Sequence, residues 1–222
     1  MGVLSRKTSI QILSFLSGKA IILYGDPGVG KSTILCHIAS KLHEKTKKPA
    51  LMIWADGNLD TSFGEELAKI SKAKVFRTKD PQKAIYILRN ALSEDLSMAV
   101  VDSVTGFEEE IMRREGATSP RVSLVMSRYG RLLMYYLAEL AHRKNVPCFA
   151  VCHAASLFEG DFRGQKDRPA FARRAVKNAD AVIYQFLQTV NGIRKPFWRI
   201  VFYRSLSSNL EGREFSLEEI LK

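Results

Sequence analysis

Residues 20–33 read AIILYGDPGVGKST, and this stretch decides the fold. Its first five residues, Ala20–Tyr24, are all apolar, as in a strand that is buried on both faces of a parallel sheet. Residues 25–33 then match the pattern G-x-x-x-x-G-K-[ST] in full, and residues 31–47 have the pattern of a helix. A strand, a glycine-rich loop and a helix in this order form a phosphate-binding P-loop. The stretch therefore predicts a nucleotide-binding α/β domain.

The residue types in this loop suit a nucleotide bound with Mg²⁺. Glycines let successive backbone N–H groups turn inward around phosphate groups, and the helix N-terminus adds the positive end of its dipole. Lys31 is expected to reach the β- and γ-phosphate oxygens and Ser32 to coordinate Mg²⁺. We expect Lys31 to be exposed in the loop, so that its removal costs little stability. The predicted nucleotide-binding residues are Gly25, Asp26, Pro27, Gly28, Val29, Gly30, Lys31, Ser32 and Thr33.

Apolar runs of strand length alternate with helical patterns through most of the chain. Strands are expected at residues 50–55, 75–77, 98–101 and 147–152, and helices at 62–72, 81–93 and 122–144. Three further strands, at residues 181–187, 197–204 and 213–217, follow without helices between them, which is typical of antiparallel strands added to a sheet edge. We predict one α/β domain over residues 1–222, with a mostly parallel central sheet, flanking helices and a short lead-in at residues 1–19.

Asp102 follows the apolar run Met98–Val101 and is expected at the carboxyl end of a buried strand. Ligands of open α/β sheets bind at this edge, where a carboxylate can hold Mg²⁺ directly or through water. The alternative is an aspartate that only caps a turn. Ser103 follows where ATPases of the AAA+ type usually place glutamate, which disfavours that class. The sequence has no NKxD element, which weighs against a GTPase. It also has no LSGGQ signature in the required place, which weighs against an ABC-type ATPase.

The charge is strongly basic, with a formal net charge of +11. Residues 151–204 hold ten basic and four acidic side chains. A localised basic excess suggests a polyanionic partner, nucleic acid first, although a solvated lysine-rich surface explains it equally well.

The three cysteines, Cys36, Cys148 and Cys152, have no metal-binding spacing and are expected to be reduced core thiols. No apolar run is long enough to cross a bilayer, and no secretory signal is recognisable. We therefore expect a cytoplasmic protein with no membrane partner.

Three further blocks resemble one family. Residues 100–106 (VVDSVTG), 145–153 (NVPCFAVCH) and 204–212 (RSLSSNLEG), in this order after the P-loop, resemble RecA/RadA recombinases, and above all short archaeal RadB-like RadA paralogues. The resemblance covers roughly residues 20–218. It implies a RecA-type ATPase core that uses ATP and Mg²⁺, acts with single-stranded DNA in recombinational repair, and has a recombinase as a possible protein partner.

The resemblance also assigns catalytic roles to Lys31, Asp56 and His153. Asp56 stands where the family places a glutamate that polarises the attacking water, and its side chain is one methylene shorter; the alternative is an aspartate in an Asp-Gly turn. His153 stands where the family has a glutamine that senses the γ-phosphate. A partly buried structural histidine is the alternative.

Two DNA-facing segments follow from the same resemblance: a loop at residues 113–121 and a longer segment at residues 154–177. Their basic groups would neutralise phosphates, and interleaved phenylalanines would stack on bases. A solvated loop is the alternative for the second segment. The predicted DNA-binding residues are Arg113, Arg114, Arg121, Arg163, Lys166, Arg168, Arg173, Arg174 and Lys177.

Three functions remain open at this point. The first is a slow ATPase that acts on or near single-stranded DNA; the second is a pseudo-ATPase that holds DNA or a protein. The third is a P-loop kinase for a small molecule, with residues 154–177 as its lid. The family's polymerisation segment has no clear match, so we do not expect long filaments. Arg199 and Arg204 are candidates for arginine fingers acting in trans.

Overall fold

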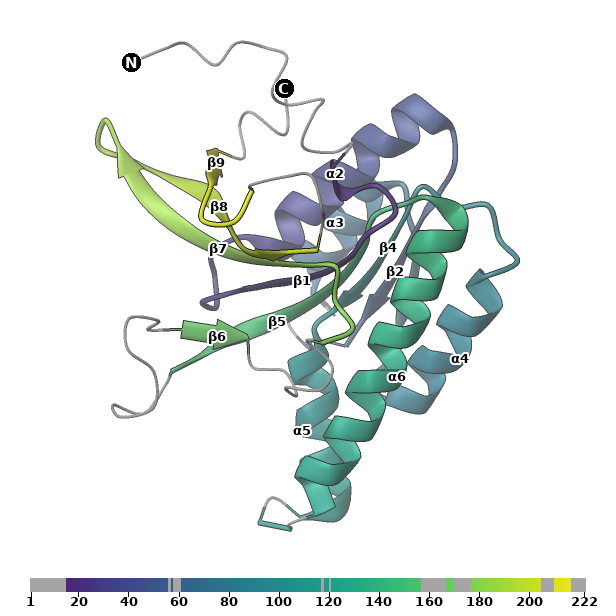
Figure 1. Ribbon diagram of the computed structural model, residues 1–222. Helices are drawn as coiled ribbons and strands as arrows, with labels where there is room; N and C mark the ends of the chain where they lie inside the picture. The colour runs from purple at the N-terminus through teal and green to yellow at the C-terminus, as the bar shows by residue number, and fades with distance from the viewer. Residues whose placement is uncertain are drawn as a thin grey trace.

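The computed structural model describes residues 15–55, 57, 61–116, 118–119, 121–156, 167–169, 177–204 and 210–216. These residues form one nine-stranded sheet with helices on both faces (Figure 1). The strands are β1 (Ala20–Gly25), β2 (Ala50–Trp54), β3 (Lys74–Arg77), β4 (Met98–Asp102), β5 (Cys148–Ser156), β6 (Asp167–Pro169), β7 (Ala181–Val190), β8 (Ile193–Tyr203) and β9 (Glu214–Ser216). The helices are α2 (Lys31–Thr46), α3 (Ser62–Ser71), α4 (Pro81–Ala91), α5 (Val104–Glu115) and α6 (Arg121–Lys144).

The sheet has the order β3-β2-β4-β5-β1-β7-β8-β9, and β6 pairs with β5 off this path. The six strands from β3 to β7 in this order are parallel, whereas β8 and β9 add to the edge in antiparallel orientation. Parallel strands buried on both faces read as continuous apolar runs, and every residue of β1, β2 and β4 is buried. The predicted fold class, a mostly parallel sheet with antiparallel C-terminal strands, is confirmed.

Two apolar cores lie on the two faces of the sheet. Helices α2 and α3 bury residues such as Leu35 and Leu67 on one face. Helices α4, α5 and α6 bury Leu88, Phe107 and Leu137 on the other face, as Figure 1 shows for the helices that carry them. This arrangement places the carboxyl ends of β1 and β4, with the loops that follow them, at one edge of the sheet.

Helix α5 was not expected from the sequence. Its apolar residues Val104, Phe107 and Ile111 have helical spacing and are buried, but Gly106 weakens the helical pattern. The structure gives the reason for this glycine: a Cβ atom at position 106 would lie 2.0 Å from the carbonyl oxygen of Ala55. The start of α5 therefore packs directly on the chain that leaves β2.

The C-terminal hairpin is longer than predicted. Strand β7 continues to Val190 and β8 begins at Ile193, so only Asn191 and Gly192 form the turn. Both turn residues have positive φ, at 53° and 77°, as a two-residue hairpin turn of the Asn-Gly type requires. This dipeptide was the overlooked signal in the sequence.

The three cysteines are buried and form no disulfide, as expected. Among the described helices, none has the length and apolar character needed to cross a membrane.

Candidate nucleotide site

The P-loop connects the end of β1 to the start of α2. Gly28 and Gly30 have φ values of 78° and 82°, in the left-handed region that favours glycine. A Cβ atom at either position would meet nothing within 4 Å, so these glycines serve the backbone conformation and not tight packing. Because the first N–H groups of a helix have no intrahelical acceptor, the start of α2 offers donors to an anion.

Lys31 is the first residue of α2, and its ammonium group is held by the loop itself. The Nζ atom donates hydrogen bonds to the carbonyl oxygens of Gly25 at 2.9 Å and Asp26 at 2.8 Å. The side chain is only 7% exposed. The expectation of an exposed lysine was wrong, because the long side chain folds back along the loop and satisfies two of its carbonyl groups.

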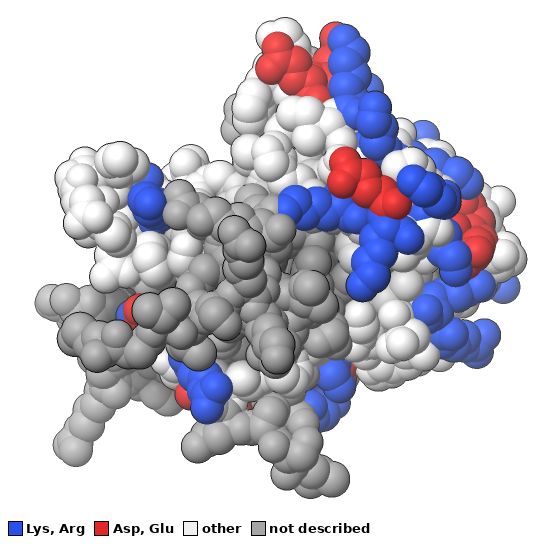
Figure 2. Space-filling view, turned by 90° about the horizontal axis from the view of Figure 1, so that it is seen from above, with Lys and Arg blue, Asp and Glu red and all other residues white. Residues whose placement is uncertain are grey.

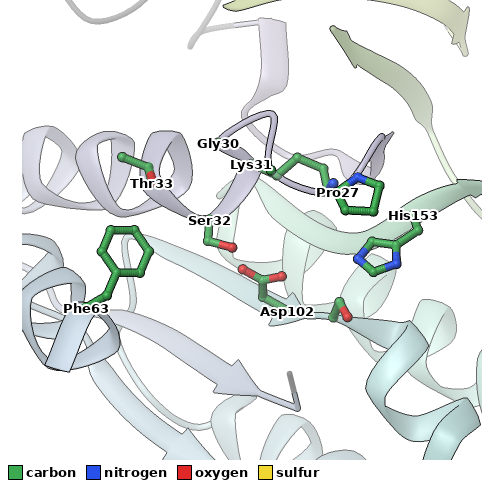
Figure 3. A pocket seen from close by; sticks show the side chains of 10 residues that line it. Pro27, Gly30, Lys31, Ser32, Thr33, Phe63, Asp102 and His153 are labelled. Atoms are coloured by element: carbon green, nitrogen blue, oxygen red, sulfur yellow. The ribbon is translucent and has the colours of Figure 1, made fainter. Parts of the chain in front are cut away.

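A cavity of about 300 Å³ lies against this loop. It is lined by Pro27, Gly28, Gly30, Lys31, Ser32, Thr33, Phe63, Asp102, Ser103 and His153. Figure 3 shows the side chains of Ser32 and Asp102 pointing toward one another, with His153 entering from β5 on the other side. Residues that are far apart in the sequence thus meet where parallel strands end.

Asp102 ends β4 and is 3% exposed. Burial of the Cys36 thiol, together with the negative charge of Asp102, raises the pKa of that thiol to about 12. The peptide bond between Asp102 and Ser103 is cis. Asp102 is thus a buried carboxylate that lines the same cavity as Ser32 and points toward its side chain (Figure 3). The magnesium role of both residues stays a prediction.

Asp56 lies outside the described residues. Its neighbour Ala55 is buried, and the Ala55 N–H donates to the carbonyl oxygen of Asp102 at 2.7 Å. The chain therefore passes the end of β4 immediately before position 56. The role of Asp56 stays a prediction.

His153 lies in β5, paired in register with Gly25 of β1. Its ring is partly buried and lines the cavity. His153 lies within β5, which continues to Ser156, whereas the sequence predicted that this strand ends at residue 152. The sensing role of His153 stays a prediction.

Two residues with contacts to the site were missed in the sequence. Phe63, in the first turn of α3, is 51% exposed and gives the cavity an aromatic wall. Gln185, in β7, is fully buried and donates from Nε2 to the carbonyl oxygen of Val29 at 2.7 Å. No local pattern marks either residue, because their partners are distant in the chain.

The first predicted DNA-binding segment is not a loop throughout. Arg113 and Arg114 lie in the last turn of α5, and both donate to the carboxylate of Glu110, at 2.7 to 2.8 Å. These hydrogen bonds lower the pKa of Glu110 to about 2. The expectation of a loop at Arg113 and Arg114 was wrong, because α5, whose buried apolar residues lie at 104–111, continues to Glu115. Arg121 is exposed at the start of α6.

Most of the second DNA-binding segment lies outside the described residues, including Arg163, Lys166, Arg173 and Arg174. Arg168 belongs to β6, and Lys177 is exposed. Lys177 accepts a hydrogen bond from Arg204 at its carbonyl oxygen at 2.8 Å. On the face shown in Figure 2, Lys and Arg side chains lie among Asp and Glu side chains.

The arginine-finger candidates have partners within the chain. Arg199 pairs with Glu214 of β9 at 2.6 Å and lies over the ring of Phe186, 5.2 Å from its centre. Arg204 donates to the backbone near the start of β7. Arg199 thus links β8 to β9, and Arg204 links the end of β8 to the residues that precede β7. A role of either arginine in trans stays a prediction.

Comparison with known proteins gives the family context of this site. No protein-family model matches the chain. The solved structures that match over most of its length include a RadB recombinase, with a TM-score of 0.62 and 15% sequence identity over 96% of this chain and 94% of that one. They also include a KaiC-like protein from Pyrococcus horikoshii, with a TM-score of 0.58 and 18% sequence identity over 90% of this chain and 85% of that one. The chain has the fold of a RecA-type P-loop ATPase.

The sequence comparison points the same way. The chain is 28% identical to the DNA repair protein RadA of Aquifex aeolicus over 159 residues, and 25% identical to that of Bacillus subtilis over 161 residues. These matches cover 68% of this chain and 31% of each relative, so the chain spans about a third of the length of these relatives. The resemblance to RecA/RadA recombinase paralogues is confirmed.

Proposed function

We propose that this protein binds ATP with Mg²⁺ and hydrolyses it slowly, acting with DNA in recombinational repair. The observation that carries the proposal is the meeting of Lys31, Ser32 and Asp102 around one cavity beside two left-handed glycines. The open space around both glycines and the lysine bound to backbone carbonyls suit a phosphate chain, which would take over the ammonium group.

The residues present also suit a magnesium ion that the nucleotide brings with it. Within the described part of the chain, no group of three or more His, Cys, Asp or Glu side chains could hold a metal alone. Ser32 and Asp102 supply two oxygen ligands, directly or through water, and Mg²⁺ commonly combines few protein ligands with phosphates and water. When bound, the ion would neutralise charge that develops on the phosphates.

Hydrolysis would depend on how the chain positions water. Lys31 and the loop amides would stabilise charge on the phosphates, and Asp56 would orient the attacking water. Since the Asp56 side chain is one methylene shorter than the glutamate of the family, we expect turnover well below the ~1–100 s⁻¹ typical of kinases. His153 would approach the same end of the phosphates from β5.

The DNA partner is supported by charge and by relatives. Residues 151–204 carry ten basic against four acidic side chains, and both sequence relatives are named as DNA repair proteins. Residues 154–177, together with Arg121, are the proposed DNA contact. Arg113 and Arg114 contribute less, because Glu110 neutralises part of their charge.

A pseudo-ATPase is the second candidate, favoured by the departures at Asp56 and His153. Such a protein would keep ATP as a structural ligand while holding DNA or a protein partner. A small-molecule kinase has no support from the RecA-type fold.

A steady-state ATPase assay with and without single-stranded DNA separates these functions. We expect slow, magnesium-dependent hydrolysis that DNA stimulates and that Lys31→Ala abolishes. ATP binding without turnover would establish the pseudo-ATPase, and phosphorylation of an added metabolite would establish the kinase.

A further inference from the structure

Gln185 contacts the P-loop at both of its ends. Its side-chain Nε2 donates to the carbonyl oxygen of Val29 at 2.7 Å, near the C-terminal end of the loop. Its own carbonyl oxygen packs on Gly25, at the N-terminal end, so closely that a Cβ atom on Gly25 would lie 2.2 Å away. One residue of β7 thus fixes the loop where it leaves β1 and where it enters α2.

The orientation of the Gln185 amide is determined by its two partners. Its Oε1 accepts a hydrogen bond from the indole Nε1 of Trp198 at 3.0 Å. Because an indole N–H can only donate and a backbone carbonyl can only accept, Oε1 must face Trp198 and Nε2 must face Val29. The opposite orientation would leave both partners facing like groups.

Trp198 is itself buried, with partners in three strands. It lies directly opposite Gln185 in the pairing of β7 with β8 and is 1% exposed. Its ring packs near Phe149 of β5, with 6.2 Å between the ring centres, and β9 pairs with its strand. The antiparallel C-terminal strands therefore position Trp198, and Trp198 in turn orients the amide of Gln185.

The direction of the Val29 carbonyl matters for phosphate binding. A P-loop works because its N–H groups converge on the anion, which requires that the carbonyl groups between them point elsewhere. Gln185 gives the Val29 carbonyl a partner on the side of β7, one residue before the left-handed Gly30. A carbonyl that lost this partner could turn toward the cavity and repel a phosphate.

We propose that Gln185 is a positioning residue that keeps the P-loop in its phosphate-binding conformation, with Trp198 fixing the orientation of its amide. The inference rests on the proposed ATP binding and gives the antiparallel strands a role in the nucleotide site. Gln185 acts through the loop backbone and takes no part in the reaction itself.

The test compares four full-length variants with the wild type: Gln185→Leu, Trp198→Phe, the double variant, and Ile183→Ala as a control. Ile183 lies two residues before Gln185 in the same strand and is also buried in the apolar core. Its truncation weakens the core while leaving the hydrogen bonds of Gln185 in place. ATP affinity is measured by isothermal titration calorimetry. Amide hydrogen exchange of residues 25–33 is measured without nucleotide.

Gln185→Leu should weaken ATP binding about tenfold, a usual size for the loss of one buried hydrogen bond and its unpaired acceptor. It should also speed amide exchange in the P-loop. Trp198→Phe should have a smaller effect on both measurements and none when Gln185 is already leucine, because the tryptophan acts through the glutamine. Ile183→Ala should lower thermal stability while leaving both measurements at the wild-type level.

Equal affinity and equal exchange in Gln185→Leu and the wild type would overturn the inference, as would equal losses in Gln185→Leu and Ile183→Ala. If the wild type bound no ATP, the proposed function would fail. The exchange experiment would still decide whether Gln185 orders the loop.

Discussion

Replacing Lys31 with methionine removes the ammonium group while keeping an apolar side chain of similar length. Near 4 Å and at an effective dielectric constant of about 20, one lysine–phosphate charge pair is worth ~4 kcal/mol. In the wild type, ATP must first take the ammonium from the Gly25 and Asp26 carbonyl oxygens, which offsets about 1–2 kcal/mol of this gain. The net loss of ~2–3 kcal/mol corresponds to ATP binding that is roughly 30- to 150-fold weaker.

The hydrogen bonds of Lys31 to the loop carbonyl groups also affect the free energy of unfolding. The variant loses two hydrogen bonds inside the loop, yet it also avoids burying a charged group that is only 7% exposed. We expect the free energy of unfolding to fall by no more than about 2 kcal/mol. Titration calorimetry gives the affinity, and chemical denaturation gives the stability. Lys45→Met, on the exposed end of the same helix, is the control and should change neither.

Two outcomes would refute this reasoning. A loss of affinity below about threefold would show that the ammonium does not reach the phosphates. A variant that fails to fold would show that Lys31 serves mainly to stabilise the loop through its hydrogen bonds to the carbonyl groups.

Three further outcomes are expected. Asp56→Asn should lower the rate of ATP hydrolysis with little change in ATP affinity, as steady-state kinetics and titration would show; an unchanged rate would make Asp56 a turn residue only. Neutralising Arg168, Arg173 and Arg174 together should weaken single-stranded DNA binding and reduce the salt slope by up to about 0.7 per lost phosphate contact in fluorescence anisotropy, with ATP binding retained. Cys36, whose thiol pKa is raised to about 12 by burial and the charge of Asp102, should resist a thiol reagent at pH 8 until the protein is denatured; rapid labelling of the native protein would contradict its burial.

The parts of the fold that follow from local patterns could be predicted from the sequence. β1, the P-loop and α2 form one continuous signal, and buried parallel strands such as β2 and β4 are apolar at every position except the final Asp102. Asp102 was predictable because strand ends meet at one edge of such a sheet.

Helix α5 could not be predicted because Gly106 lowers the local helix propensity. The glycine is required by a tertiary contact, the close approach to Ala55. The burial of Lys31 depends on how the loop folds, which the motif alone does not specify. Gln185 could not be found either, since its bond to Val29 joins residues 156 positions apart. Contacts of that range depend on the order of strands in the sheet, and the pairing of β7 with β1 is read only from the structure.

The central claim is that Lys31, Ser32 and Asp102 form a site for ATP with Mg²⁺, and one titration tests it most directly. ATP is titrated calorimetrically into the wild-type protein and into Asp102→Asn, each with Mg²⁺ and with EDTA. The account predicts saturable binding of one ATP per chain to the wild type, much tighter with Mg²⁺ than with EDTA, and a smaller magnesium dependence in Asp102→Asn. No binding of ATP by the wild type in the presence of Mg²⁺, or the same magnesium dependence in both proteins, would contradict it.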